Sequence, residues 1–240
     1  MANLVRLGHS NYFLEKHVNM TRCIETDECL DVLASLEHCA LSLRQAQQSD
    51  RAWKWVVLSL HSALQGAMVC HLSGTTEEGA LTTKCVKEWF EWHEKDRRGE
   101  ISRVQEGVDE LGIPTMRIAR KEDNPPQDIV ASASELFGRL SCPSKRIESS
   151  CGAIIKTTER QQTAFTRLHN LRNKFTHFSP KGWSIELEYI EETIEDILGV
   201  ICLIQDDPWP FRDMAEESMS ALYSTIEEIR SILAHRATQK

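Results

Sequence analysis

The hydrophobic positions of the N-terminal half predict two long helices. Over Thr26–Gln48 the apolar residues recur at steps of three and four, which is the spacing of one face of an amphipathic helix. Over Ala52–Leu72 they occur on nearly every side, and a helix that is apolar all round is expected at the centre of a bundle. Ser49-Asp50 lies just before this second helix and offers it an N-cap.

The C-terminal half shows the same helical periodicity. A long helix is predicted over Ser149–His177, and it should stop at Ser179–Gly182, because proline and glycine end helices. Two further amphipathic helices are predicted at Glu188–Gln205 and Asp213–Arg236, separated by Pro208–Pro210. Long helices joined by short connections predict an all-α fold, a helical bundle.

The segment 74–145 differs from both halves, because charged runs and helix-breaking residues interrupt its pattern. Short helices are predicted at Cys85–Asp96, Ile101–Leu111 and Asp128–Leu140. About seventy residues with so little apolar material would be marginally stable alone. We therefore expect a single domain over residues 1–240, with a largely helical insertion between the second and third core helices.

Composition limits the classes of site. Eight cysteines are spread through 240 residues without a CxxC pair, and no two Cys/His pairs have the close spacing of zinc ligands. The chain is too long and too poor in cysteine to be a disulfide scaffold. Neither a metal nor a cofactor is expected, and Cys23, Cys39 and Cys70 should behave as small core hydrophobes.

The sequence gives no strong membrane signal. Its longest unbroken apolar run covers Ile197–Ile204, whereas a membrane-spanning helix needs about 20 residues. The segment Met1–Arg6 lacks the hydrophobic region of a signal peptide. These features predict a cytoplasmic protein without a membrane partner.

The charge is unevenly distributed along the chain. The net charge is −8, but six basic residues and one acidic residue give Lys156–Lys181 a charge of +5. Thirteen acidic residues and one arginine give Trp183–Glu228 a charge of −12. Two interpretations are open: the basic segment is a local anion site, or adjacent helices of opposite charge attract each other.

The basic segment contains a compact polar motif near its predicted helix end. Arg172 and His177 are separated by four residues, and Asn173 follows the arginine. Positions five apart on a helix differ by about 140°, so Arg172 and His177 do not share a face by spacing alone. Asn173 and His177 are four apart and do share one. Unwinding of the last turn could bring the histidine round toward the arginine.

The motif Arg172-Asn173-x3-His177 resembles the R-x4–6-H motif of HEPN domains. Asn173 also fits that family, and so do the segments 53–55, 60–66 and 178–186. The resemblance covers about 26–74 and 149–236 but not the insertion. It implies a helical bundle and a metal-independent endoribonuclease from bacterial toxin–antitoxin, phage-defence or CRISPR systems. It also implies a homodimer whose two motifs face each other, with RNA as substrate and an antitoxin or a nucleotidyltransferase as further partner.

The residue types suit RNA cleavage. A histidine with a pKa near about 6.5 can take the proton of the 2′-hydroxyl or protonate the leaving 5′-oxygen. A guanidinium can hold two phosphate oxygens at once. The resemblance therefore implies that His177 is the base or acid, that Arg172 stabilises the phosphate charge, and that Asn173 orients His177 or binds the phosphate. Further candidate RNA contacts are Lys174, Arg167, Lys181 and His169.

Each of these residues also has an ordinary structural interpretation. Arg172 could pair with acids of Glu186–Glu195, and His177 could be a favourable cation at a helix C-terminus. The additional basic residues could form a solvated face. His61 and Gln65 could line a cleft beside the motif or be satisfied core residues. The alternative function is a catalytically inactive HEPN-like module that binds RNA, a nucleotide or a partner protein.

Overall fold

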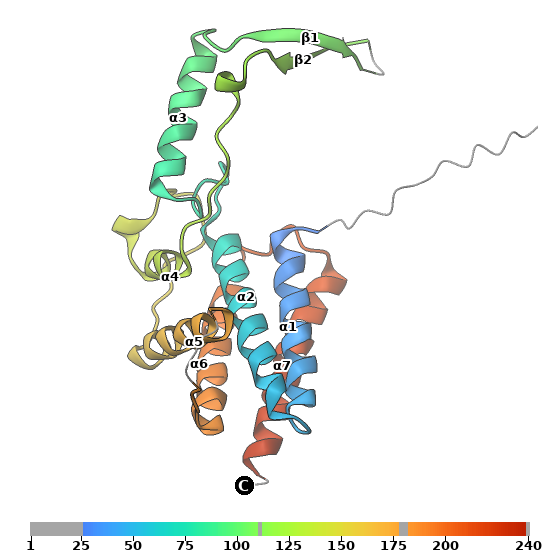
Figure 1. Cartoon of the computed structure of the whole chain (residues 1–240), viewed down its shortest axis with the longest axis vertical. Coiled ribbons are helices and arrows are strands. Elements are labelled where there is room, and N and C mark those ends of the chain that lie inside the picture. The colour runs from blue at the N-terminus through green and yellow to red at the C-terminus, as the bar shows by residue number, and fades with distance from the viewer. Residues whose placement is uncertain (1–25, 110–111, 178–181, 239–240) are drawn as a thin grey trace, which may run out of the picture.

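The computed structural model describes residues 26–109, 112–177 and 182–238. It is mostly helical, as predicted, and its elements surround one main hydrophobic core (Figure 1). The bundle helices are α1 (Glu28–Gln45), α2 (Trp53–Leu72), α4 (Ala133–Ser141), α5 (Glu159–Thr176), α6 (Leu187–Gln205) and α7 (Glu216–Ala237).

α2 is the central helix of the bundle, as its all-round apolar pattern predicts. It packs against α1, α4, α5 and α6, and Val56, Leu60 and Met68 are fully buried. The stretch Asp50–Leu72 is long and apolar enough to cross a membrane, but 67% of its most apolar window is buried inside the bundle. Buried core helices commonly have this length and composition, so this stretch is only weak evidence for a membrane-spanning helix.

One predicted helix cap and the predicted start of the long C-terminal-half helix are wrong. Asp50–Ala52 forms a 3-10 turn, η1, and α2 begins after Ala52 without a side-chain cap, so Ser49-Asp50 does not serve as its N-cap. α5 begins at Glu159 and not at Ser149. Thr158 caps it through a capping box with Gln161, which gives a local reason for the start at this point.

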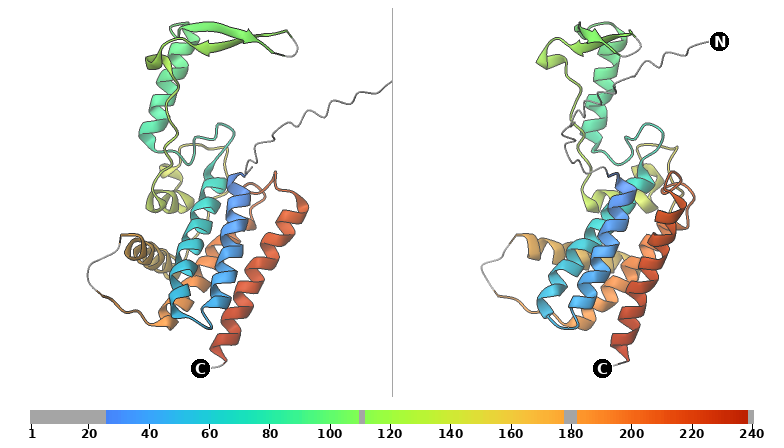
Figure 2. Two further views of the ribbon diagram at one scale, coloured as in Figure 1. Left: turned by 45° about the vertical axis from the view of Figure 1, so that its right-hand side comes forward. Right: turned by 90° about the vertical axis from the view of Figure 1, so that its right-hand side faces the viewer.

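An arm projects from the end of the bundle opposite the C-terminus (Figures 1 and 2). It consists of α3 (Thr83–Arg97), the antiparallel strands β1 (Arg103–Val108) and β2 (Pro114–Ile118), and the 3-10 turn η2 (Lys121–Asp123). The prediction of α3 is confirmed, but the predicted helix over Ile101–Leu111 is wrong, because this stretch contributes β1 of a hairpin.

The turn of the hairpin explains the misprediction. Asp109 closes it through two hydrogen bonds with Ile113. The backbone N–H of Asp109 donates to the carbonyl of Ile113 at 2.9 Å, and the backbone N–H of Ile113 donates to Asp109 Oδ1 at 2.8 Å. Gly112 has a positive φ of 77°. A left-handed residue at this point favours glycine and ends a helix. Both strands are exposed over most of their length, so no buried face imposes a clear periodicity on their sequence.

The 74–145 segment is only partly an excursion from the bundle. α4 starts at Ala133, later than the predicted Asp128, and packs against α2. Leu136 and Leu140 are fully buried in the main core. The short turn η3 (Pro143–Lys145) follows, and the chain then returns to the bundle.

Glu148 fixes the loop that leaves α2. Its carboxylate accepts backbone N–H bonds from Gly74, Thr76 and Gly79 at 2.9, 3.0 and 2.7 Å. Partial burial alone would raise the pKa of this carboxyl, but the hydrogen bonds outweigh burial and hold it below its usual 4.5. The charged carboxylate therefore stabilises this junction.

Glu148→Gln should lower the free energy of unfolding by about 1–2 kcal/mol at pH 7, because charge-assisted hydrogen bonds are lost at a partly solvated site. The stabilisation from a lowered carboxyl pKa is present above about pH 4.5 and is lost as the pH falls below it. Urea unfolding should thus show a smaller difference in stability between Glu148→Gln and the unmodified protein at pH 3.5 than at pH 7. Glu37→Gln on the exposed side of α1 is the control, and an equal loss in both variants would contradict this role.

Candidate functional site

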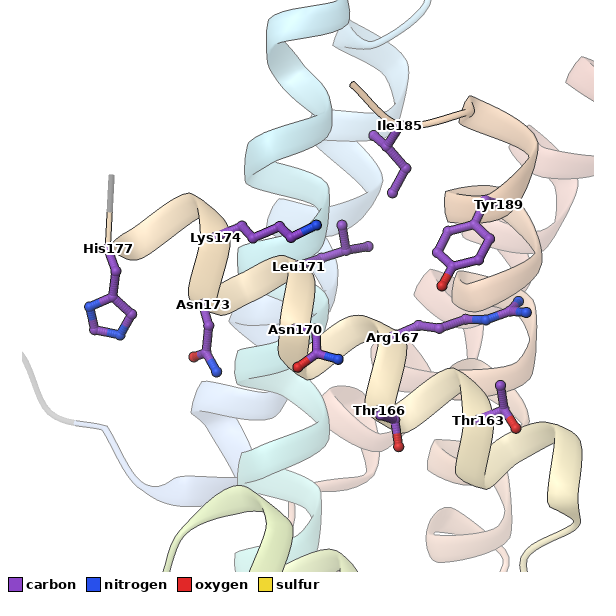
Figure 3. A pocket seen from close by; sticks show the side chains of 10 residues that line it. All are labelled: Thr163, Thr166, Arg167, Asn170, Leu171, Asn173, Lys174, His177, Ile185 and Tyr189. Atoms are coloured by element: carbon purple, nitrogen blue, oxygen red, sulfur yellow. The ribbon is translucent and has the colours of Figure 1, made fainter. Parts of the chain in front are cut away.

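α5 separates its side chains into a core face and an outer face. Ala164, Phe165, Leu168 and Leu171 are buried toward the bundle. The outer face repeats polar residues at steps of three and four from Thr163 to His177. Figure 3 shows Asn170, Asn173 and His177 along this outer side.

The outer face of α5 and the start of α6 enclose a surface pocket of about 910 Å³. Its lining residues are Thr163, Thr166, Arg167, Asn170, Leu171, Asn173, Lys174, His177, Ile185 and Tyr189.

The structure brings two of the three motif residues together in this pocket. Asn173 and His177 both line it, in agreement with their four-residue spacing. His177 is exposed and is the C-cap residue of α5, where the backbone leaves the helix with φ −97° and ψ 7°. Its side chain therefore has freedom to meet a ligand or a second chain.

Arg172 does not line the pocket. It is half-buried, and its Nη1 donates a hydrogen bond of 3.0 Å to Oδ1 of Asn173. The same guanidinium lowers the pKa of both His61 and His169 by its charge. Asn173 thus connects a pocket that contains His177 to an arginine held beside two histidines.

His61 and His169 form a hydrogen-bonded pair behind the motif. His61 Nε2 and His169 Nδ1 are 3.2 Å apart, and His61 is only 5% exposed. Burial first, then the charges of Arg172 and His169, lower the pKa of His61 to about 4. Burial and Arg172 also lower the pKa of His169. Both imidazoles are therefore neutral at pH 7, so one can donate to the other.

This pairing settles where the predicted cleft residues lie. His61 and the half-buried Gln65 are on α2, and neither is among the residues lining the pocket. His61 is a satisfied buried residue, the second of the two sequence interpretations. His169 faces His61 and stacks at 5.9 Å on Phe165, so it does not belong to the outer face either.

The additional basic residues fall into two groups. Arg167 lies 4.2 Å from the centroid of the Tyr189 ring, and its Nη1 is 3.7 Å from Glu192 Oε2. Arg160 Nε pairs with Asp196 Oδ2 at 2.7 Å. For these two arginines, attraction between oppositely charged helices is what the structure shows.

Lys174 lines the pocket as Arg167 does, but it is exposed, with its Nζ 5.4 Å from the centroid of the Trp183 ring. Lys181 lies outside the described residues. Among the described residues, no group of three or more His, Cys, Asp or Glu side chains is arranged to hold a metal.

Several pocket residues were missed from the sequence. Thr163, Thr166 and Asn170 follow from stepping back three or four positions from His177, a signal that was present. Ile185 and Tyr189 had no such signal, because they reach the pocket only through the packing of α6 on α5 (Figure 3).

Comparison with known proteins does not assign a family. No family model, no curated protein and no solved structure matches the chain.

The buried histidine makes stability depend on pH. The pKa of His61 is about 4 in the folded state and 6.5 in the unfolded state. The stability that the neutral, buried imidazole allows is therefore fully present above pH 6.5 and is lost as the pH falls toward 4. His61 alone should cost about 2 kcal/mol of unfolding free energy at pH 5. Urea unfolding at pH 7.5 and pH 5 should show this loss, and His61→Gln should reduce it.

An NMR titration of the imidazoles provides the site-specific check. Arg172→Ala should raise the pKa of His61 but keep it below 6.5, because burial is the larger cause. The exposed His38 on α1 is the internal control. Titration of His61 near 6.5 in the unmodified protein would contradict the buried pair.

Proposed function

We propose that this protein is a metal-independent endoribonuclease of HEPN type that acts as a homodimer. The observation that supports it most is the joint placement of Asn173 and His177 in one surface pocket at the end of a bundle helix, with Arg172 hydrogen-bonded to Asn173. The motif thus ends in an exposed imidazole and is backed by a guanidinium, the two groups that the chemistry requires.

The proposed reaction is an internal transfer at one RNA phosphate. A neutral imidazole takes the proton of the 2′-hydroxyl, whose oxygen attacks the adjacent phosphorus, and the bond to the 5′-oxygen breaks. A protonated imidazole gives that oxygen its proton, which leaves a 2′,3′-cyclic phosphate and a 5′-hydroxyl. The guanidinium of Arg172 stabilises the charge that develops on the phosphate oxygens.

A second copy supplies what one chain lacks. One protomer carries a single His177, whereas the reaction needs a base and an acid at the same phosphate. Exposure of His177 at the end of α5 leaves it accessible to the same residue of a second copy. Two facing motifs would provide two histidines and two arginines around one phosphate.

The alternative proposal is an inactive HEPN-like module that binds RNA, a nucleotide or a partner protein. The direction of Arg172 favours it, because this side chain faces the His61–His169 pair and does not line the pocket with His177. In an active dimer Arg172 would have to reach the phosphate past Asn173. The role we propose is cytoplasmic, in bacterial toxin–antitoxin or phage defence, with an antitoxin or a nucleotidyltransferase as partner.

RNA cleavage in the presence of EDTA tests the enzyme. The unmodified protein should cut single-stranded RNA and leave 2′,3′-cyclic phosphate ends. His177→Ala should reduce the rate by about 10²–10⁴, the range for loss of a general acid or base. Arg172→Ala should reduce it by about 10²–10³, as for loss of one charge-stabilising donor.

Two matched variants separate the motif from general effects. His38→Ala removes an exposed histidine from α1, outside the pocket, and should leave the rate unchanged. Arg172→Lys keeps the charge but loses the planar fork, so only partial recovery is expected. Equal rates in all preparations would indicate a contaminating nuclease. Binding of RNA without any cleavage would favour the inactive module.

The dimer is tested separately by light scattering. We expect a homodimer at micromolar concentration, and the rate of cleavage per chain should fall when dilution produces monomers. His177→Ala should remain dimeric, because its loss of activity is attributed to chemistry. A strictly monomeric protein that still cleaves RNA would contradict a site shared between two copies, but it would remain consistent with catalysis by the motif of one chain.

A further inference from the structure

Two cysteines far apart in the sequence meet where α1 begins and α2 ends. Cys29 lies in the first turn of α1 and Cys70 near the end of α2, and their Sγ atoms are 3.6 Å apart. Formation of a disulfide requires an approach to about 2.05 Å. Rotation of two side chains already in contact can provide this change, because both cysteines are free thiols.

The pair borders a pocket that reaches solvent. Cys29 and Cys70 line a cavity of about 300 Å³ together with Glu28, Arg212 and Asp213. Cys29 is partly exposed, whereas Cys70 is 7% exposed. A small oxidant can thus reach the first sulfur while the second lies directly behind it.

The environment divides the two thiols into different roles. The hydrogen bond from Cys70 lowers the pKa of Cys29, although burial and the carboxylates of Asp27, Glu28 and Asp213 act in the opposite direction. The same bond and burial raise the pKa of Cys70. Cys29 can also donate to the carbonyl of Pro210 at 3.5 Å.

We propose that Cys29 and Cys70 are a reversible, peroxide-sensitive thiol pair that closes a disulfide between α1 and α2. The Cys29 thiolate attacks one oxygen of hydrogen peroxide, the O–O bond breaks, and a sulfenic acid and hydroxide form. The sulfur of Cys70 then attacks the Cys29 sulfur. The S–O bond breaks, and the departing oxygen leaves as water with the Cys70 proton. Two thiols are oxidised and one peroxide is reduced to two waters.

The remaining described cysteines lack this arrangement. The sulfurs of Cys39 and Cys85 are buried and contact the backbone carbonyls of Val56 and Gln127. Those of Cys142, Cys151 and Cys202 contact Ser144, Arg146 and Arg230 respectively, none of which is a thiol. Burial raises the pKa of Cys151 and Cys202, so less of each is in the thiolate form that reacts first with peroxide. Cys142 is the useful comparison, because it is also partly exposed and its pKa is lowered, chiefly by a hydrogen bond with Ser144.

The position of the pair gives the disulfide a structural consequence. The same pocket is lined by Leu81 and Val130, which pair as an antiparallel bridge where the chain enters and leaves the arm. A bond between Cys29 and Cys70 would therefore join the start of α1 to the end of α2, in the pocket that borders the base of the arm. Reducing cytosol keeps such pairs open, so closure would report oxidising conditions.

The test uses the full chain with Cys23→Ser in all samples, because Cys23 lies outside the described residues. After hydrogen peroxide treatment and blocking of free thiols, digestion with trypsin and a glutamate-specific protease isolates Cys29 in Cys29–Glu37 and Cys70 in Trp55–Glu77. We expect these two peptides to be linked and to separate on addition of a dithiol. The thermal midpoint should rise by about 10 °C on oxidation, because the bond closes a loop of 41 residues.

Two variants identify the roles of the sulfurs. In Cys70→Ala the Cys29 sulfenic acid should persist and be trapped by dimedone, and in Cys29→Ser neither the link nor the trapped acid should form. Cys142→Ser should leave the link unchanged, and far-UV circular dichroism checks the fold of each variant. The proposal is overturned if peroxide modifies Cys142 while the two peptides stay unlinked, or if dimedone labels Cys29 equally with and without Cys70.

Discussion

The rest of the fold depends on covering α2 from all sides. Its 20 residues carry apolar side chains around the whole circumference, and each large one gains about 1.5–3 kcal/mol from full burial. α1, α4, α5 and α6 provide that cover. This arrangement also buries polar side chains of α2, and each of them needs a hydrogen-bond partner in the neighbouring elements.

Two histidines of α2 meet this requirement in different ways. His61 pairs with His169 of α5, while His71 Nε2 bonds the carbonyl of Ala153 at 2.8 Å and its buried Nδ1 lies 3.9 Å from Asp207 Oδ2 without a hydrogen bond. The second bond holds the irregular segment before α5, and the first joins α2 to α5. Because Phe165, Leu168 and Leu171 of α5 are buried in the core, Asn173 and His177 lie on the other side of the helix. The orientation of the candidate site is thus a consequence of core packing.

The sequence was informative where burial imposes a periodicity and silent where it does not. α6 was predicted almost to the residue, because one of its faces is buried along its length. The predicted start of α5 is too early. Ile155 is buried although it lies in an irregular segment, where its backbone N–H donates to the carbonyl of Leu140, so its burial does not require a helix. The shared face of Asn173 and His177 followed from helix geometry. The hydrogen bond from Arg172 to Asn173 and the effect of Arg172 on His61 could not, because His61 lies on another helix more than a hundred residues earlier.

The charges of α5 and α6 show why the candidate site lies at one end of the helix. Carboxylates of α6 meet Arg160 and Arg167, in the first part of α5. The positive charge that remains toward solvent is then concentrated near Lys174, beside His177. A helix C-terminus carries partial negative charge, which opposes a bound phosphate by about 0.3–1 kcal/mol. One lysine and one arginine outweigh this partial charge, and a phosphate at this end would gain further from a second set of cations. In the function we propose, the second copy of the chain brings that charge together with the second histidine.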